Sequence, residues 1–285
     1  EYLLAFQQSD GGIYQRESAV ANYETSIAIL ALHECNTSGR YDEIIQKARR
    51  FLTAIQWDES EGNTYADPEY GGAGYGRHER PDLSNTAFLI DALKGVGASS
   101  DDPAIQRALI FVSRSQNLEG VYDILELATK NPDGGFYYTP ANGGESQAGT
   151  TPTGGLRSYG SMTYSGLRSM IYAGVSANDP RVVAAIKWLG RHYTFAENPG
   201  MGDAGLFYYF HTAAKALHVL GQDQFIDADG KAHDWRKDLA GVLLSAQHDN
   251  GSWVNNNSRW LEGDANLVTS YALLALSYCQ ASAIE

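Results

Sequence analysis

Side chains capable of acid–base or anion-binding chemistry occur in or near several Gly-rich segments of this chain. His211 lies in the segment Tyr-Phe-His-Thr, and its imidazole can act as a general acid or base or as a hydrogen-bonded wall residue. Arg77 and His78 lie in one Gly-rich stretch and Arg157 in another, so they can bind an anionic group or form loop salt bridges. Glu24 stands at the start of an apolar segment, where a carboxylate is either an acid or a helix cap.

Six tyrosines accompany these polar residues and indicate an aromatic surface. Such a surface can stabilise a carbocation, stack on sugar rings or hold an isoprenoid chain. The alternative is that many of them are half-buried structural residues. The six are Tyr137, Tyr138, Tyr159, Tyr164, Tyr208 and Tyr209.

Composition and charge exclude several classes of partner. The chain has 285 residues and a formal net charge of −13. This acidity argues against nucleic acid or an anionic membrane surface as a partner, because nothing would neutralise phosphates. With 43% hydrophobic and 19% charged residues, the chain is expected to be globular. Two cysteines are too few for a disulfide scaffold, and no apolar run is long enough to predict a transmembrane segment.

A repeat of about 60 residues organises the chain. Each unit has an apolar helical segment ending in Gln or a substitute, then a Gly-rich aromatic turn, then a second apolar helical segment. The first segments are residues 3–8, 51–56, 111–116, 188–193 and 243–247. The second segments are residues 25–32, 86–93, 163–170, 210–217 and 269–276.

These two kinds of segment predict outer and inner helices. Asp102 and Asp179 each place a capping carboxylate before a Pro at the first helical position, and one face of the following helix is apolar. The second segments are apolar nearly all round, as helices packed on several sides must be. We therefore predict an all-α fold, an α/α toroid of about five helical hairpins that forms a single domain over residues 1–285. Residues 117–158 form a long loop or lid at the mouth of this ring.

The two cysteines share a register in the repeat. Cys35 follows Thr25 by ten residues, and Cys279 follows Thr269 by ten. If five hairpins close a ring, the two thiols face each other across the seam and can form a disulfide. The alternative is two unrelated buried thiols at an apolar position.

Residues 239–253, LAGVLLSAQHDNGSW, resemble the QW repeat of squalene cyclases through Gln247, Gly251 and Trp253. Together with the other repeats, the chain resembles the terpenoid cyclase and protein prenyltransferase toroid superfamily over nearly its whole length. The resemblance implies chemistry at the mouth of the ring, where the inner helices begin. Several helix N-termini that converge there provide a positive potential.

The acid motif of squalene cyclases, DxDDTA, corresponds here to residues 82–87. Asp82 is retained, whereas Ser84 replaces the proton donor and Asn85 replaces its neighbour. Asp82 is thus a candidate acid or the N-cap of an inner helix. Glu24 stands at the register of the last Asp of that motif, but in a different repeat, so it is a candidate displaced acid.

The zinc site of protein prenyltransferases has a partial counterpart. His211 lies in a segment similar to the one that holds the family's zinc-ligating His, but residues 159–161 lack the other two ligands. Residues 227–235 do not form a calcium loop, because their Gly comes two positions too early, and they predict a tight turn before an Asp234 N-cap. We therefore expect neither a metal nor a cofactor.

The resemblance implies a protein that binds a hydrophobic or isoprenoid small molecule in a central cavity, with diverged or absent cyclase activity. A carbohydrate-active lyase or hydrolase is an alternative that an open, polar, Trp-lined cleft would favour. A non-catalytic interaction module is another, favoured if the cavity is filled by the protein's own side chains. The candidate catalytic residues are His211, Asp82 and Glu24, and the candidate ligand-binding residues are Asn85, Tyr159, Tyr164, Tyr209, Arg157, Arg77 and His78.

Overall fold

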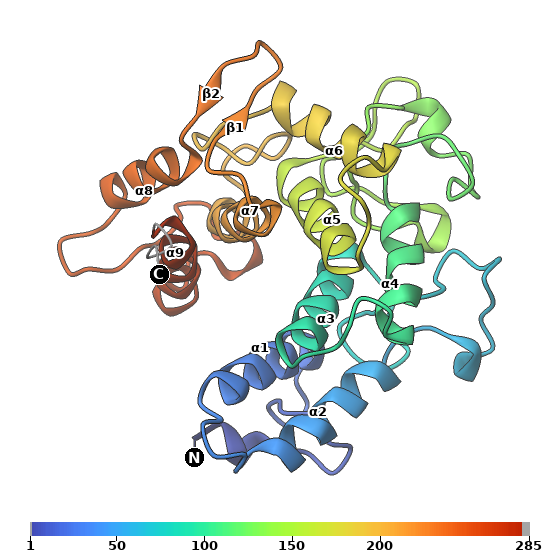
Figure 1. Ribbon diagram of the computed structural model, residues 1–285, viewed down its shortest axis with the longest axis vertical. Helices are drawn as coiled ribbons and strands as arrows, with labels where there is room; N and C mark the ends of the chain where they lie inside the picture. The colour runs from blue at the N-terminus through green and yellow to red at the C-terminus, as the bar shows by residue number, and fades with distance from the viewer. Residues whose placement is uncertain (1, 281–285) are drawn as a thin grey trace.

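The computed structural model describes residues 2–280, and this part of the chain is mostly helical (Figure 1). Five helices form an inner row: α1 (Ala21–Glu34), α3 (Leu83–Gly95), α5 (Gly160–Tyr172), α7 (Leu206–Leu220) and α9 (Ala265–Cys279). Four form an outer row: α2 (Asp42–Ala54), α4 (Pro103–Arg114), α6 (Pro180–Arg191) and α8 (Trp235–Ser245). A small antiparallel pair, β1 (Phe225–Ile226) and β2 (Ala232–His233), lies between α7 and α8 in the chain.

The inner helices pack one against the next. Extensive contacts join α1 to α3, α3 to α5, α5 to α7 and α7 to α9. Figure 1 shows these helices along an arc, with α2, α4, α6 and α8 on its outer side. The alternation of inner and outer helices agrees with the repeat. One difference concerns the first unit, where residues 3–8 were predicted as an outer helix but Tyr2–Phe6 form a short 3-10 helix, η1.

Burial follows the predicted pattern for the central inner helix α3, whereas α9 at the end of the inner row buries only Val268, Ala272 and Ala275. Every residue of α3 from Leu83 to Leu93 is buried, because the helix has neighbours on several sides. The outer helix α4 buries one face and begins with Pro103, while the side chain of Asp102 accepts a hydrogen bond from Ala104 N at 2.9 Å. None of the helices within residues 2–280 is both long and apolar enough to cross a bilayer.

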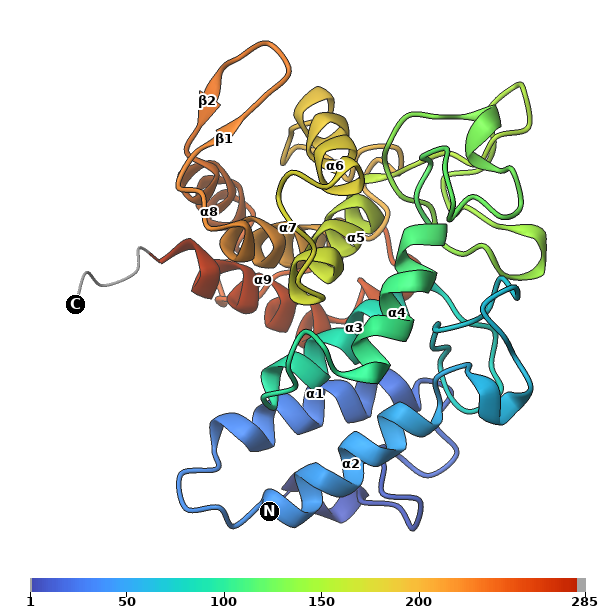
Figure 2. The same cartoon turned by 45° about the vertical axis from the view of Figure 1, so that its right-hand side comes forward.

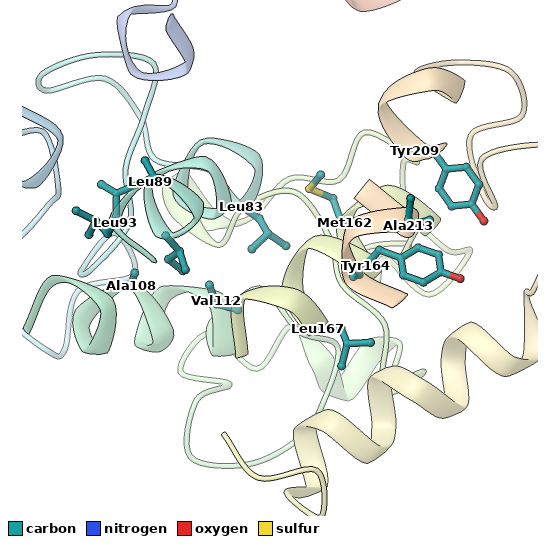
Figure 3. Close-up of a cluster of buried hydrophobic side chains, with 14 of the residues drawn as sticks. Leu83, Leu89, Leu93, Ala108, Val112, Met162, Tyr164, Leu167, Tyr209 and Ala213 are labelled. Carbon is teal, nitrogen blue, oxygen red and sulfur yellow. The ribbon is translucent and has the colours of Figure 1, made fainter. Parts of the chain in front are cut away.

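The hydrophobic core lies between neighbouring helices, as Figure 3 shows for one part of it. Leu89 and Leu93 of α3 lie beside Ala108 and Val112 of α4, and all four are fully buried. Because such sites are closely packed, truncation of Leu89 to Ala is expected to cost about 2–5 kcal/mol of folding free energy.

The repeated Gln joins four of the five units to their Gly-rich turns. Gln56 Nε2 donates to Gly71 O at 2.9 Å and to Ala104 O at 2.9 Å, so it links the end of α2, the turn and the first turn of α4. Gly71 has a φ of +84°, and a Cβ there would lie 1.9 Å from Arg107 O, so no other residue fits. Turn carbonyls also accept from the side chains of Gln8, Gln116 and Gln247.

A repeated Thr ties the same turn to the inner helix. Thr86 Oγ1 accepts a hydrogen bond from Ala73 N at 3.0 Å. The corresponding bonds are 3.1 Å long and involve Thr25, Thr163 and Thr269. Because four turns hold four inner helices through one bond type, equivalent positions of these helices lie at equivalent depths.

Within residues 2–280, the two ends of the arc are not joined by extensive packing. In the described chain, α1 and α9 are not among the helix pairs that pack extensively. Ile27 of α1 is 50% exposed and Leu273 of α9 is 55% exposed. Cys35 is exposed, Cys279 is partly buried, and both are free thiols, so the disulfide alternative is not realised. A closed toroid stays a prediction.

Residues 117–158 are anchored at the side of the molecule where the inner helices begin, on the right of Figure 2. Thr139 Oγ1 donates to Pro81 O at 2.7 Å, just before α3. Glu145 pairs with Arg80, and Gln147 Oε1 accepts from Arg259 Nη2 at 2.8 Å. The segment therefore connects the start of α3 with the chain before α9, and its role as a lid stays a prediction.

Candidate ligand-binding site on the inner helices

A continuous series of aromatic rings runs across the inner helices. Successive ring centroids in the series are 4.7 to 6.5 Å apart, within the range of favourable aromatic contact. The rings come from α1, α3, α7 and α9 and from the connection before α3. We call this set the aromatic band: Tyr75, Tyr23, Phe88, Tyr208, Tyr271, His211, Tyr278 and His218.

Most of the band is partly accessible. Only Phe88 and His211 are buried, and the remaining rings are half-buried or exposed. Rings that served only as core packing would be buried throughout, as Tyr164 and Tyr209 are. Part of the surface of the band is therefore accessible, in contrast to the buried core rings.

Hydroxyl groups connect the band across three helices. The Tyr23 hydroxyl donates to Ser84 Oγ at 2.7 Å, and Ser84 Oγ also lies 2.7 Å from the Tyr208 hydroxyl. Burial raises the pKa of both tyrosines, so they stay neutral near pH 7. Ser84 thus joins α1 to α7 through neutral hydrogen bonds.

Asp82 is the N-cap of α3. Its Oδ1 accepts from Asn85 N at 2.9 Å and its Oδ2 from Asn85 Nδ2 at 2.8 Å. Asn85 is itself held by Asn22, whose Nδ2 donates to Asn85 O at 3.2 Å. Asp82 is 1% exposed, and burial raises its pKa to about 6. A carboxylic acid with a raised pKa is a weaker acid, so this environment opposes protonation of an alkene.

His211 lies inside the band and is neutral at pH 7. Its ring stacks on Tyr271 with a centroid separation of 5.7 Å, and it is 6% exposed. Burial, followed by the charges of Lys215 and Arg168, lowers its pKa to about 3. Within residues 2–280, its Nδ1 has no hydrogen-bond partner. The imidazole can therefore exchange a hydrogen bond with a bound molecule.

Glu24, in the first turn of α1, bonds to the chain that precedes this helix. Its Oε2 accepts from Gln15 N at 3.1 Å, and it lines a groove of about 320 Å³ between η1 and α1. A second groove, of about 520 Å³, is lined by polar residues near Lys47 and Arg50. Neither groove has an aromatic-band residue among its described lining, so the structure outlines no central cavity there.

The other predicted ligand-binding residues lie outside the band. Tyr164 and Tyr209 point into the core in Figure 3, with ring centroids 5.8 Å apart, and the Tyr209 hydroxyl donates to Thr194 O at 2.6 Å. Tyr159 is buried at the N-cap of α5. Burial raises the pKa of all three. Three further residues are exposed on loops: Arg77, His78 and Arg157.

The repeat contained a signal for residues that the sequence analysis missed. Phe88 and Tyr271 both follow the repeated Thr by two residues, and they belong to the band. In contrast, Ser165 occupies this position on α5. In the part of the chain that the structure describes, no three His, Cys, Asp or Glu side chains gather as metal ligands.

Comparisons with known proteins identify no family. No protein-family profile matches the chain, and no curated protein matches it in sequence. A solved structure of a protein from Actinoplanes is 15% identical, with a TM-score of 0.40 over 98% of this chain and 96% of that one. A type II terpene cyclase from Scytonema, solved with its product merosterolic acid A, is 14% identical, with a TM-score of 0.39 over 97% and 93%. Values at this level do not define a shared fold.

Proposed function

We propose that this protein binds a hydrophobic, isoprenoid-type molecule on the aromatic band and does not start a cyclisation by protonation at Asp82. The observation that carries the proposal is the partly accessible series of rings on four inner helices. The hairpin organisation and the resemblance of residues 239–253 to the QW repeat support a toroid related to terpenoid cyclases and prenyltransferases.

The physical basis is the fit between aromatic faces and unsaturated hydrocarbon. Ring faces are apolar and carry partial negative charge, so they favour alkyl chains, double bonds and cations. The hydroxyls of Tyr23 and Tyr208 already bond to Ser84, so they do not require a polar ligand. A chain of isoprene units lying across successive rings would cover apolar surface of the protein.

Three of the five tryptophans, Trp188, Trp235 and Trp253, are buried. The indole N–H groups of Trp235 and Trp253 donate to backbone carbonyls at 2.9 and 2.7 Å. These three rings are therefore not available to stack on sugars, whereas Trp57 is half-buried and Trp260 is 44% exposed.

Calorimetric titration with farnesol tests the proposal. Wild-type protein should bind farnesol in the micromolar range. Tyr271→Ala removes a ring between Tyr208 and His211, and it should weaken binding about tenfold, which corresponds to about 1.4 kcal/mol. The matched control is Tyr65→Ala, a half-exposed tyrosine outside the band. The proposal fails if farnesol does not bind, or if the two variants bind it equally well.

A further inference from the structure

A buried charged cluster occupies one repeat position on the three central inner helices. Asp91, Arg168 and Lys215 each stand five residues after the first residue of the second apolar segment of their unit, at 86, 163 and 210. The same position holds Leu30 on α1 and Leu274 on α9. Charged residues thus replace leucine only where the helix has inner neighbours on both sides.

The three side chains lie within ion-pair distance of one another's charges. Lys215 Nζ donates to Asp91 Oδ2 at 2.9 Å. Arg168 Nε lies 3.0 Å from Asp91 Oδ1, but its N–H does not point at that oxygen, so this contact is a charge pair and not a hydrogen bond. The side chains of Arg168 and Lys215 are only 1% and 12% exposed.

Hydrogen-bonding capacity is left over around Arg168. No partner among residues 2–280 takes its Nε or its Nη1, or the hydroxyl of Ser169 on the same helix. The Ser165 hydroxyl lies beside that of Tyr208 and acts to lower the pKa of this tyrosine. Buried donors without partners are costly, about 1–3 kcal/mol each and more for charged groups. The unpartnered acceptor beside them is Asp91 Oδ1, so unpartnered donors outnumber unpartnered acceptors here and an added acceptor would take the surplus.

The electrostatics of the cluster point to an anion. Two cations face one carboxylate, which leaves one net positive charge in a buried place. Burial lowers the pKa of Lys215. The charge of Asp91 opposes this shift, and the charge of Arg168 adds to it. An uncompensated buried cation is strongly unfavourable, so a monoanion beside Arg168 would balance the site.

The cluster adjoins the aromatic band. Burial raises the pKa of Tyr208 and of Tyr278, and the charge of Arg168 acts against both shifts. Arg168 and Lys215 likewise add to the lowered pKa of His211.

Asp91 follows Phe88 by three residues on α3, and Lys215 follows His211 by four on α7, so each shares a helix face with a ring of the band. A molecule lying on the band can therefore place one end next to the cluster.

We infer that Arg168, with Lys215 and the hydroxyls of Ser165 and Ser169, binds the carboxylate of an amphiphilic ligand whose hydrocarbon part lies on the aromatic band. This inference rests on the proposed function and adds the head group. A bidentate Arg–carboxylate contact would use the donors of Arg168 that are now free. A diphosphate carries more negative charge than the single net positive charge here, and Asp91 would repel it.

The test compares farnesoic acid, farnesol and farnesyl diphosphate by calorimetric titration at pH 7.5. Wild-type protein should bind farnesoic acid at least tenfold more tightly than farnesol, and more tightly than the diphosphate. Arg168→Gln should bring the ratio of acid to alcohol affinity close to one. Arg16→Gln changes an exposed arginine outside the cluster and should retain the wild-type ratio.

If Arg168→Gln does not fold, the double variant Ser165→Ala with Ser169→Ala serves instead, and its ratio should fall about threefold or more. Equal binding of farnesol and farnesoic acid by the wild type overturns this inference alone. The inference is also overturned if farnesyl diphosphate binds more tightly than farnesoic acid, or if the cluster variants keep the wild-type ratio of acid to alcohol affinity. Absence of binding by all three molecules overturns both this inference and the proposed function.

Discussion

Burial determines what the carboxyl group of Asp82 can do. Both oxygens accept hydrogen bonds from Asn85, yet desolvation raises the pKa from 3.8 to about 6. The folded protein therefore favours the protonated form. The contribution of Asp82 to stability is fully present below its ordinary pKa near 4, and it is lost as pH rises through about 6.

The substitution Asp82→Asn tests whether the pKa of this carboxyl group is raised. Asn is as good an N-cap as Asp, and its side-chain oxygen can still accept from Asn85 N. We expect the variant to match the wild type near pH 4 and to become more stable by about 2–3 kcal/mol at pH 7.5. Urea unfolding across this pH range measures the difference. A stability difference that does not change with pH would show that the carboxyl has an ordinary pKa.

His211 is a second example at the level of single residues. The segment Tyr-Phe-His-Thr identified His211 as a candidate. Within residues 2–280 its Nδ1 has no hydrogen-bond partner, and its pKa is lowered. Tyr271 stacks on its ring, and the charges of Lys215 and Arg168 lower its pKa; these three residues come from three helices. A short motif identifies such a residue but does not contain its surroundings.

At the level of elements, α7 depends on a residue that follows it by more than forty positions. The helix begins after Gly205, which has no side chain to cap it. Glu262 instead accepts hydrogen bonds from Phe207 N at 3.2 Å and Tyr208 N at 2.7 Å, and from Asn255 Nδ2 at 2.6 Å. A carboxylate at a helix N-terminus also interacts favourably with the helix dipole.

Glu262→Ala should therefore destabilise the protein by about 2–3 kcal/mol, because it leaves buried N–H groups of α7 without an acceptor. Glu262→Gln retains one oxygen and should lose less. Glu119→Ala, at an exposed glutamate, should change the free energy of unfolding by less than about 0.5 kcal/mol. Denaturant unfolding of the three variants decides this. Equal stability of Glu262→Ala and Glu119→Ala would remove the capping role.

The repeat explains which elements the sequence could predict. Gln56 and Thr86 recur because four of the five units use the same bonds to the turn, so inner and outer helices were recognisable. The tyrosines of the aromatic band were not. Tyr208 lies in the band while Tyr209 lies in the core, because neighbours on a helix point about 100° apart. Clustering along the chain therefore does not predict clustering in space.

On the scale of the whole molecule, the arc brings residues of different repeat units into contact. Packing of successive inner helices brings residues from α3, α5 and α7 into one charged cluster, and residues from α1 and α9 into one band. The chain as a whole is acidic, with a net charge of −13, whereas this cluster has one excess cation. Composition predicts the net acidity of the chain, but it does not predict the excess positive charge of this cluster.

The two cysteines lie at the two ends of the arc and are free thiols. Cys35 follows α1 and is exposed, whereas Cys279 ends α9, where burial raises its pKa to about 11. Because the thiolate is the reactive form, iodoacetamide at pH 8 should label Cys35 at least tenfold faster than Cys279. Intact-mass measurement without reductant should show two successive additions, and Cys35→Ser should remove the fast one. No addition before reduction would mean that the thiols are bonded, and it would require α1 and α9 to meet and close the ring.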